Sequence, residues 1–186
     1  MNEFEIVLLR VVDVLGRSRI PYMLTGGLAV TYYGEPRTTH DIDVVILISS
    51  ADITRIKGML EPDFSVGEES IKAALREGSM FNALHEETGF KVDFWMLKLD
   101  EYDRARLSRR VQVSVLGVTM SLPTAEDVII SKLDWFKQSD IDKHFSDARG
   151  IVAIQKGNLD TAYIARWCEA KGLLGLWQKV EREAGQ

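Results

Sequence analysis

The chain is poor in the residues that form disulfide frameworks and zinc clusters. Its 186 residues include one cysteine, three histidines and four prolines. One cysteine cannot form an intramolecular disulfide, and the isolated histidines His40, His85 and His144 lack zinc-like spacing. We therefore expect no disulfide scaffold and no zinc site, and we expect these histidines to be structural or exposed. Cys168 lies beside Trp167 in an amphipathic segment and is predicted to pack in the core.

The sequence also lacks a long apolar run and an excess of basic charge. Residues 3–18 carry an amphipathic stripe interrupted by charges, which is typical of neither a signal peptide nor a membrane-spanning helix. The net charge of −5 argues against a protein that grips duplex DNA by neutralising many phosphates. We expect a cytoplasmic protein without a membrane or duplex DNA partner. The 46% apolar content suits one core, or one core with a helical appendage.

A pair of carboxylates at the start of an apolar strand is the most informative feature that is present. Asp41 and Asp43 stand at i and i+2 within residues 37–48, so both point to one face of a strand. Val45 and Leu47 share that face, while the intervening aliphatic residues occupy the other. Like charges this close are costly unless a cation joins them, so the spacing predicts a divalent metal.

A glycine doublet precedes the acidic strand. Thr25 is followed by Gly26 and Gly27, and residues 28–33 then read as a short helix closed by Gly34. A backbone that turns without Cβ atoms into a helix N-terminus exposes N–H groups suited to a phosphate. The sequence thus predicts a phosphate-binding turn just ahead of the metal-binding acids.

A third acid lies in a later apolar strand. In residues 89–97 the alternation places Asp93 on one face with Lys91 and Trp95, opposite an apolar set. An isolated carboxylate there is costly to bury unless it is paired or bound to metal. Three carboxylates on one sheet face suit two Mg²⁺ ions, or Mn²⁺, roughly 3.5–4 Å apart, as in phosphoryl transfer.

The order of these motifs resembles the nucleotidyltransferase (DNA polymerase β-like) superfamily. A glycine doublet comes first, then an Asp-x-Asp strand, then an apolar-Asp-apolar strand. Downstream, residues 123–135 and 145–151 are similar to the bacterial AbiEii-like group, which includes toxins of type IV toxin–antitoxin systems. The resemblance runs from about Tyr22 to the C-terminal segments and implies the nucleotidyltransferase fold.

The resemblance also implies roles for individual residues. It makes Asp41 and Asp43 metal ligands, and Asp93 a third ligand that helps deprotonate the acceptor hydroxyl. Gly26 and Gly27 would meet the triphosphate, Lys132 would neutralise it, and Asp147 would belong to the catalytic set. Many members carry serine where this chain has Gly27, so Thr25 or backbone N–H groups would have to replace that hydroxyl.

Three of these positions have competing interpretations. Lys132 either binds nucleotide or flanks a helix in water, because its neighbours have core spacing. Arg37 either clamps phosphate or base through its planar guanidinium or is simply exposed. Asp147 either belongs to the active site or pairs with Arg149 or Lys143 on a helix surface.

The expected fold is α+β, with a mixed sheet flanked by helices and followed by a helical bundle. We expect a catalytic domain over residues 1–122 and a helical domain over residues 123–186, with Lys132 and Asp147 facing the acids across a cleft. The expected helices are 3–18, 28–33, 50–60, 68–77, 124–137, 143–155, 159–170 and 173–183. The expected strands are 22–25, 41–48, 79–86, 90–97, 111–116 and 118–122.

The leading functional hypothesis is a Mg²⁺-dependent nucleotidyltransferase that moves a nucleoside monophosphate from an NTP to a hydroxyl. An RNA 3′ end or a protein side chain is the favoured acceptor, and an antibiotic-like small molecule is the other choice. The resemblance to toxins implies a cognate antitoxin as partner. The main alternative is a catalytically silent nucleotide- or partner-binding module of the same fold. A phosphodiesterase is disfavoured because no paired histidine accompanies the acids.

Overall fold

The computed structural model describes residues 1–39 and 41–185, and His40 lies outside this described part. The chain divides into two compact units. The first comprises Met1–Gly26 and Thr39–Leu122, and the second comprises Gly27–Thr38 and Pro123–Gln186. Across residues 1–39 and 41–185, no helix combines the length and apolarity that crossing a membrane requires.

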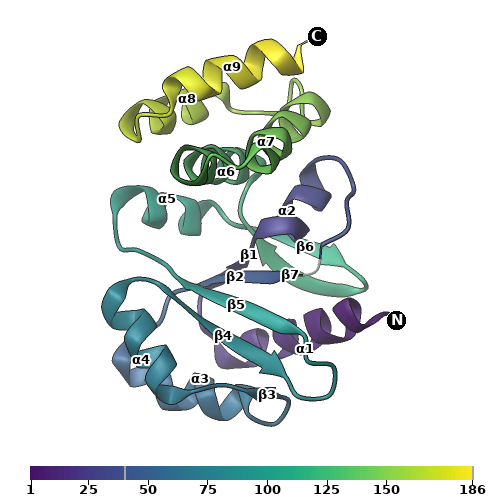
Figure 1. Ribbon diagram of the computed structural model, residues 1–186, viewed down its shortest axis with the longest axis vertical. Helices are drawn as coiled ribbons and strands as arrows, with labels where there is room; N and C mark the ends of the chain where they lie inside the picture. Colours follow the sequence, from purple (N-terminus) through teal and green to yellow (C-terminus); the bar gives the residue numbers. More distant parts are fainter. Residues whose placement is uncertain (40, 186) are drawn as a thin grey trace. The chain divides into compact units, whose positions relative to one another are not determined.

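A five-stranded mixed sheet forms the centre of the first unit (Figure 1). In spatial order its strands are β1 (Tyr22–Leu24), β2 (Ile42–Ile46), β5 (Lys91–Met96), β4 (Met80–His85) and β3 (Phe64–Ser65). The two middle strands β2 and β5 run parallel, and the other neighbouring pairs are antiparallel. A parallel pair at the centre places the residues of β2 and β5 side by side in matching order.

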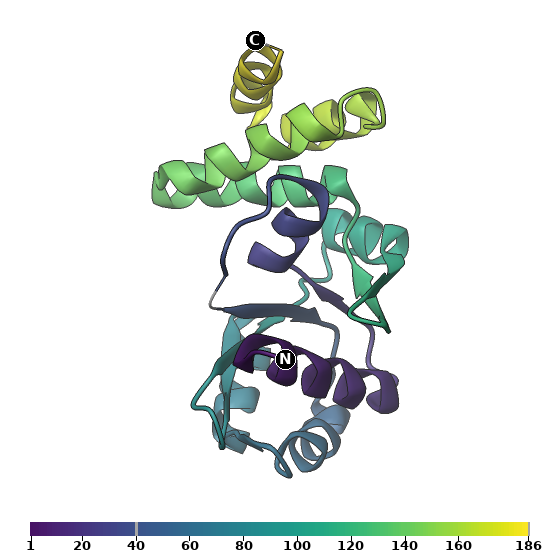
Figure 2. The ribbon, with the colours of Figure 1, turned by 90° about the vertical axis from the view of Figure 1, so that its right-hand side faces the viewer.

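Helices of the first unit lie on both faces of this sheet. They are α1 (Glu3–Ser18), the short 3₁₀ helix η1 (Ser50–Asp52), α3 (Ile53–Leu60) and α4 (Glu68–Glu77) on one side, and α5 (Glu101–Arg109), whose Leu107 packs near Val45, on the other. Helix α1 begins with a capping box between Asn2 and Glu5 and runs along one side of the sheet with α3 and α4 (Figure 2). Phe81 and Phe94 stack beneath them with ring centroids 4.9 Å apart. A separate hairpin, β6 (Val111–Val115) and β7 (Val118–Leu122), completes the unit.

The second unit is helical. It contains α2 (Gly26–Tyr33) from its second residue onward, with α6 (Ala125–Ser139), α7 (Asp142–Ile154), α8 (Thr161–Ala170) and α9 (Leu174–Ala184). Thr124 caps α6 by accepting a hydrogen bond from the Asp127 N–H. Helices α6 and α7 pack side by side, and α7 also packs against α9 (Figure 1).

The end of α2 is fastened to α7 and to the start of α6. The Tyr33 hydroxyl donates to the Pro123 carbonyl at 2.8 Å, and the Gln155 side-chain amide donates to the Tyr33 carbonyl at 2.8 Å. Gly34 lies so close to Ile151 that a Cβ at position 34 would be 3.0 Å from the isoleucine side chain. These contacts explain why residues 27–38 group with the C-terminal helices.

The predicted fold class is confirmed. The mixed sheet and its flanking helices occur where the alternation and helical spacing placed them, and α1 and α4 have the predicted bounds. The two-residue strand β3 was not predicted. Strand β3 is too short to show alternation, which is the property on which the strand predictions depend.

Candidate active site

Three polar residues lie in one row across the sheet of the first unit. Asp43 on β2 is paired in register with Asp93 on β5, and Asp93 is paired in turn with Asn82 on β4. Residues opposite each other on neighbouring strands project to the same face. The shared face of Asp43 and Asp93 is the one that the alternation predicted. Asn82 was not predicted as a site residue.

The Asp43 carboxylate lies against the turn that begins α2. Gly26 has a φ of +59°, and a Cβ built there would fall 1.9 Å from Asp43 Oδ2. Glycine is therefore required at this position for two reasons: its backbone is left-handed, and the Asp43 carboxylate occupies the space that a Cβ would need. The Thr25 N–H also donates to the Asp43 carbonyl at 2.9 Å, and Trp95 Nε1 donates to Asp43 Oδ1 at 3.2 Å.

The Asp93 carboxylate is held from two sides. The Asn82 amide donates to Oδ1, and the Lys91 ammonium lies 3.1 Å from Oδ2. Asp93 is 8% exposed, whereas the Lys91 side chain is 48% exposed. The sequence placed Lys91 on the face of Asp93. The alternation within residues 79–86 separates Asn82 from its buried neighbours in the strand. Its pairing with Asp93 could not be predicted, because that pairing depends on the register between β4 and β5.

Asp41 differs from the other two acids because it precedes β2 and is exposed. The Thr39 hydroxyl donates to its main-chain carbonyl at 3.2 Å. Beyond the acids, the same sheet face becomes apolar, with Met23, Val45 and Leu97 in contact with Leu47, Trp95 and Leu107. The polar row therefore lies beside an apolar cluster on the same face of the sheet.

The donors in this region are of the type that a divalent cation prefers. Asp43 and Asp93 offer hard carboxylate oxygens from adjacent strand positions, and the absent Cβ of Gly26 leaves space at Asp43 Oδ2. Within residues 1–39 and 41–185, no three acidic, histidine or cysteine side chains are already grouped around one point as a metal site. The residues fit Mg²⁺ in chemistry and strand placement, and ligation would require the carboxylates to turn toward a common ion.

A second charged cluster lies within the helical unit. Asp147 on α7 accepts from Arg37 through both oxygens, at 3.0 and 3.1 Å, and Lys132 Nζ on α6 lies 2.9 Å from Asp147 Oδ2. Lys132 and Asp147 are 8% and 7% exposed. We call these three residues the Arg37–Asp147–Lys132 cluster. Its two cations share one carboxylate, which leaves a net charge of +1.

The contacts in this cluster exclude the non-functional alternatives that the sequence left open for Lys132, Asp147 and Arg37. Lys132 is buried in an ion pair and does not flank the helix in water. Asp147 pairs with Arg37 and Lys132, while Arg149 lies 3.6 Å from Glu183. Arg37 is held by a planar two-bond contact and is not a freely exposed loop arginine.

The positive charge of the cluster affects a nearby histidine. Burial lowers the pKa of His144, and the Lys132 ammonium lowers it further, while Asp147 acts in the opposite direction. His144 therefore favours the neutral form at physiological pH.

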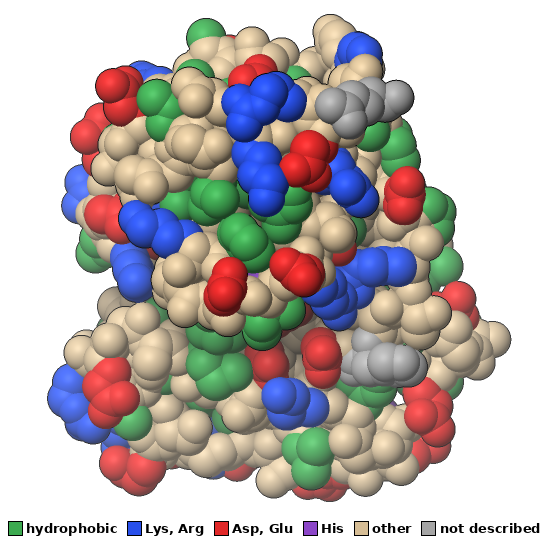
Figure 3. Space-filling model, turned by 45° about the horizontal axis from the view of Figure 1, so that its top comes forward, with side chains coloured by type: hydrophobic (Ala, Val, Ile, Leu, Met, Phe, Trp, Pro, Cys, Tyr) green, Lys and Arg blue, Asp and Glu red, His purple; other side chains and the backbone are tan. Residues whose placement is uncertain are grey.

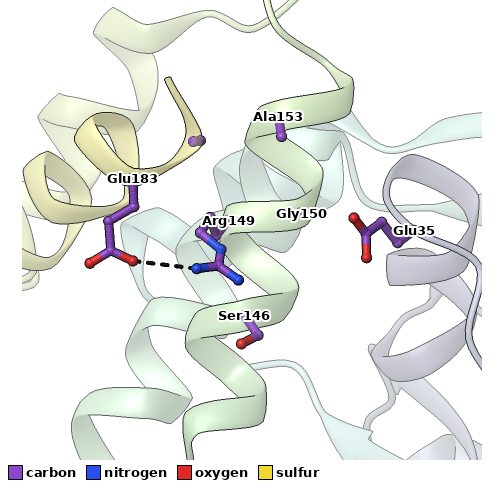
Figure 4. Close-up of a pocket in the computed structure, with 7 residues that line it drawn as sticks. Glu35, Ser146, Arg149, Gly150, Ala153 and Glu183 are labelled. Atoms are coloured by element: carbon purple, nitrogen blue, oxygen red, sulfur yellow. Dashed lines mark ion pairs between the residues drawn. The ribbon is translucent and has the colours of Figure 1, made fainter. Parts of the chain in front are cut away.

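A cavity of about 270 Å³ also lies in the helical unit (Figure 4). Figure 4 shows Arg149 reaching toward Glu183 on one side, while Glu35 approaches α7 near Gly150. The lining residues are Glu35, Ser146, Arg149, Gly150, Ala153, Glu183 and Ala184. They include none of the residues predicted to bind nucleotide or metal, so this cavity is not the candidate active site.

Known structures share the architecture. No protein-family model and no curated protein matches the sequence. Among solved structures, the antibiotic-resistance factor ANT(2'')-Ia matches with a TM-score of 0.55 and 12% identity, over 92% of this chain and 97% of that one. An antigenic nucleotidyltransferase-like protein from Paracoccidioides brasiliensis matches with a TM-score of 0.55 and 16% identity, over 94% and 91%. The chain has the nucleotidyltransferase fold.

A third structure extends this comparison. The lincosamide antibiotic adenylyltransferase LnuA, solved with lincomycin bound, matches with a TM-score of 0.52 and 16% identity, over 83% of this chain and 98% of that one. At such identities the likeness concerns the fold alone. The architecture that the motif order implied is thereby confirmed, and the chemistry of this chain is argued from its own residues.

Proposed function

We propose that the protein is a nucleotidyltransferase that transfers a nucleoside monophosphate from an NTP to a hydroxyl and releases pyrophosphate. The observation that carries this proposal is the pairing of Asp43 with Asp93 on adjacent parallel strands, beside the Gly26 turn, within the nucleotidyltransferase fold. Two carboxylates at neighbouring positions are costly unless a cation joins them, so a purely structural role accounts poorly for the arrangement.

Asp41, Asp43 and Asp93 are the proposed ligands of Mg²⁺. A bound divalent cation would neutralise the triphosphate and orient its α-phosphate toward the acceptor. Asp93 itself is proposed to accept the proton of the acceptor hydroxyl, since its carboxylate is oriented by fixed contacts on both oxygens. Most of the rate enhancement would then come from positioning and charge neutralisation.

The turn at Gly26 and Gly27 is the proposed contact for the triphosphate. The left-handed backbone of Gly26 leads directly into α2. The main-chain N–H groups in the first turn of a helix have no partner within the helix and suit a phosphate. Thr25 stands immediately before the turn and is the proposed replacement for the hydroxyl that a serine at position 27 would supply. Backbone donors carry no net charge, so added positive charge would strengthen binding.

Lys132 and Arg37 are the proposed source of that positive charge in the helical unit. They share Asp147 as a single counter-ion, and the resulting +1 charge suits a polyphosphate. Asp147 is proposed to orient the two cations and to leave part of their donor capacity for phosphate oxygens. An arginine has five N–H donors and a lysine three, which exceeds what one carboxylate accepts.

The acceptor is proposed to be a hydroxyl on a small or locally held molecule. Basic and acidic side chains are interspersed over the face drawn in Figure 3, which does not suit a long phosphate backbone. LnuA was solved with lincomycin, and a second structure of ANT(2'')-Ia contains adenylyl-2''-tobramycin, which supports an antibiotic-like acceptor. An RNA 3′ end and a protein side chain are supported by the AbiEii-like resemblance, as is a toxin role with an antitoxin partner.

Binding of metal and nucleotide is the first test. We expect Mg²⁺ with at least one of the four NTPs to stabilise the wild type, by about 2.7 kcal/mol at ligand concentrations 100 times Kd. The shift in melting temperature should vanish in an Asp41→Ala, Asp43→Ala double variant. A Glu86→Ala, Glu87→Ala double variant removes the same charge from the β4–β5 turn and should keep the shift.

Transfer is then measured with the NTP that binds, labelled at the α-phosphate, against small-molecule, RNA and protein acceptors. Release of pyrophosphate is expected, and release of inorganic phosphate would indicate a phosphodiesterase instead. Absence of any shift with millimolar NTP would contradict the proposal. A shift without transfer to any acceptor would favour the second candidate, a catalytically silent nucleotide-binding module of the same fold.

A further inference from the structure

Asn82 has an unusual position for a residue outside the acidic motif. It lies on β4 directly opposite Asp93, and its side-chain amide donates to Asp93 Oδ1. Asparagine is depleted in β-strands, where β-branched and aromatic residues pack better. Its neighbours Phe81 and Ala83 face the buried side and carry the packing of β4.

The hydrogen bond limits how the Asp93 carboxylate can turn. Only the amide nitrogen of Asn82 can donate to a carboxylate, so the contact fixes the orientation of both groups. The other oxygen of Asp93 faces the Lys91 ammonium at 3.1 Å. Lys91 reaches there on a long side chain that is 48% exposed, whereas Asn82 is short and has few rotamers. Asn82 is therefore the more rigid of the two supports.

We propose that Asn82 is a positioning residue for Asp93, limiting the rotation of its carboxylate to a narrow range about the Asn82 hydrogen bond as the carboxylate binds metal and accepts a proton. This inference rests on the proposed nucleotidyltransferase function. As a neutral donor, Asn82 orients the carboxylate without cancelling its charge, and the charge remains for the cation. Partners that orient metal-binding side chains in this way typically contribute 10–100-fold to affinity or activity.

The kinetic test compares Asn82→Leu with wild type. We expect kcat for transfer to fall roughly 10–100-fold, while KM for the NTP changes less than about threefold. Binding of Mn²⁺ alone, followed by electron paramagnetic resonance, should weaken about tenfold. Because Asn82 is exposed, the melting temperature should stay within about 2 °C of wild type. Asn82→Gln keeps the donor and should recover most of the lost kcat.

Asn158→Leu is the matched control, since Asn158 is an exposed asparagine in the loop before α8. It should leave kcat and Mn²⁺ affinity unchanged. Undiminished kcat and Mn²⁺ affinity in Asn82→Leu would overturn the inference while leaving the proposed function intact. Absence of both transfer and Mn²⁺ binding in wild type would instead contradict the proposed function itself.

A direct readout of the contact does not depend on activity. The side-chain amide protons of Asn82 are observable by NMR in the protein without ligand. We expect one of them to be displaced downfield in wild type and to return toward the free-amide position in Asp93→Ala. Identical resonances in the two proteins would show that Asn82 does not hold Asp93, and would overturn the inference whatever the kinetics.

Discussion

Asp93 and Asp147 are equally buried, yet the two units surround them differently. Asp93 is 8% exposed and is held by a neutral amide and by a lysine that is half in water. Asp147 is 7% exposed and is held by a two-bond arginine contact and by a buried lysine. Burial alone therefore does not assign a role to a carboxylate. In the sheet unit the buried acid is paired with a neutral amide and a half-exposed lysine, whereas in the helical unit one buried acid is shared by two cations.

The largest expected difference between the units concerns stability. Asp147→Ala would leave Arg37 and Lys132 without their shared counter-ion, and breaking a buried pair in this way costs about 3 kcal/mol or more. Asp93→Ala should cost less than about 1 kcal/mol, because Lys91 can return to water. Urea unfolding of the two variants measures both free energies.

Asp142→Ala is the control for the helical unit, since it removes an exposed acid from the first turn of α7. Its cost should stay near 0.5 kcal/mol, the usual contribution of one such charge to a helix terminus. Equal losses in Asp147→Ala and Asp93→Ala would contradict the comparison. It would mean that the sheet acid, like the helical one, is a structural counter-ion.

Substitution of Gly26 should destabilise the protein less than Asp147→Ala does, but it should abolish nucleotide binding. Alanine there must adopt a φ near +59° at a cost of about 1–2 kcal/mol, and its Cβ would displace the Asp43 carboxylate. We expect the Mg²⁺–NTP shift in melting temperature to be lost in Gly26→Ala although the protein remains folded. Gly16→Ala, in α1 with open space around its Cβ position, should stabilise by about 0.5–1 kcal/mol and keep the shift. Retention of the shift in Gly26→Ala would rule out the proposed triphosphate turn.

The smallest effect concerns Cys168, which reports on the helical unit. Burial, and then the charge of Asp134, raise the pKa of its thiol well above the usual value for cysteine, to about 12. The unfolded chain therefore loses this proton first, so stability should decline as pH rises from about 9 toward 12.

The native thiol should react slowly with a disulfide reagent at pH 8. Asp147→Ala should raise the labelling rate at least tenfold, and Asp93→Ala should leave it unchanged. Rapid labelling of the native wild type would contradict this packing.

The local pattern of the sequence predicted much of the fold and part of the candidate site. Alternation placed Asp43 and Asp93 on the charged face of their strands, and the structure confirms that face for both. The apolar spacing predicted the bounds of α1 and α4, because helical periodicity is set by residues that lie within a few positions of each other. The roles of the individual acids stay predictions, to be decided by the variants described above.

Other features depended on partners that are distant in the chain. Asn82 joins the polar row only through the register of β4 against β5, and Lys132 is buried only because Asp147 and Arg37 meet it. Residues 27–38 group with the C-terminal helices through Gly34 and Gln155. The sequence by itself thus determined the elements and the faces on which the acids lie, since alternation is a local property. Only the tertiary structure decided which neutral and charged groups hold those acids, because strand register and helix packing are set by non-local contacts.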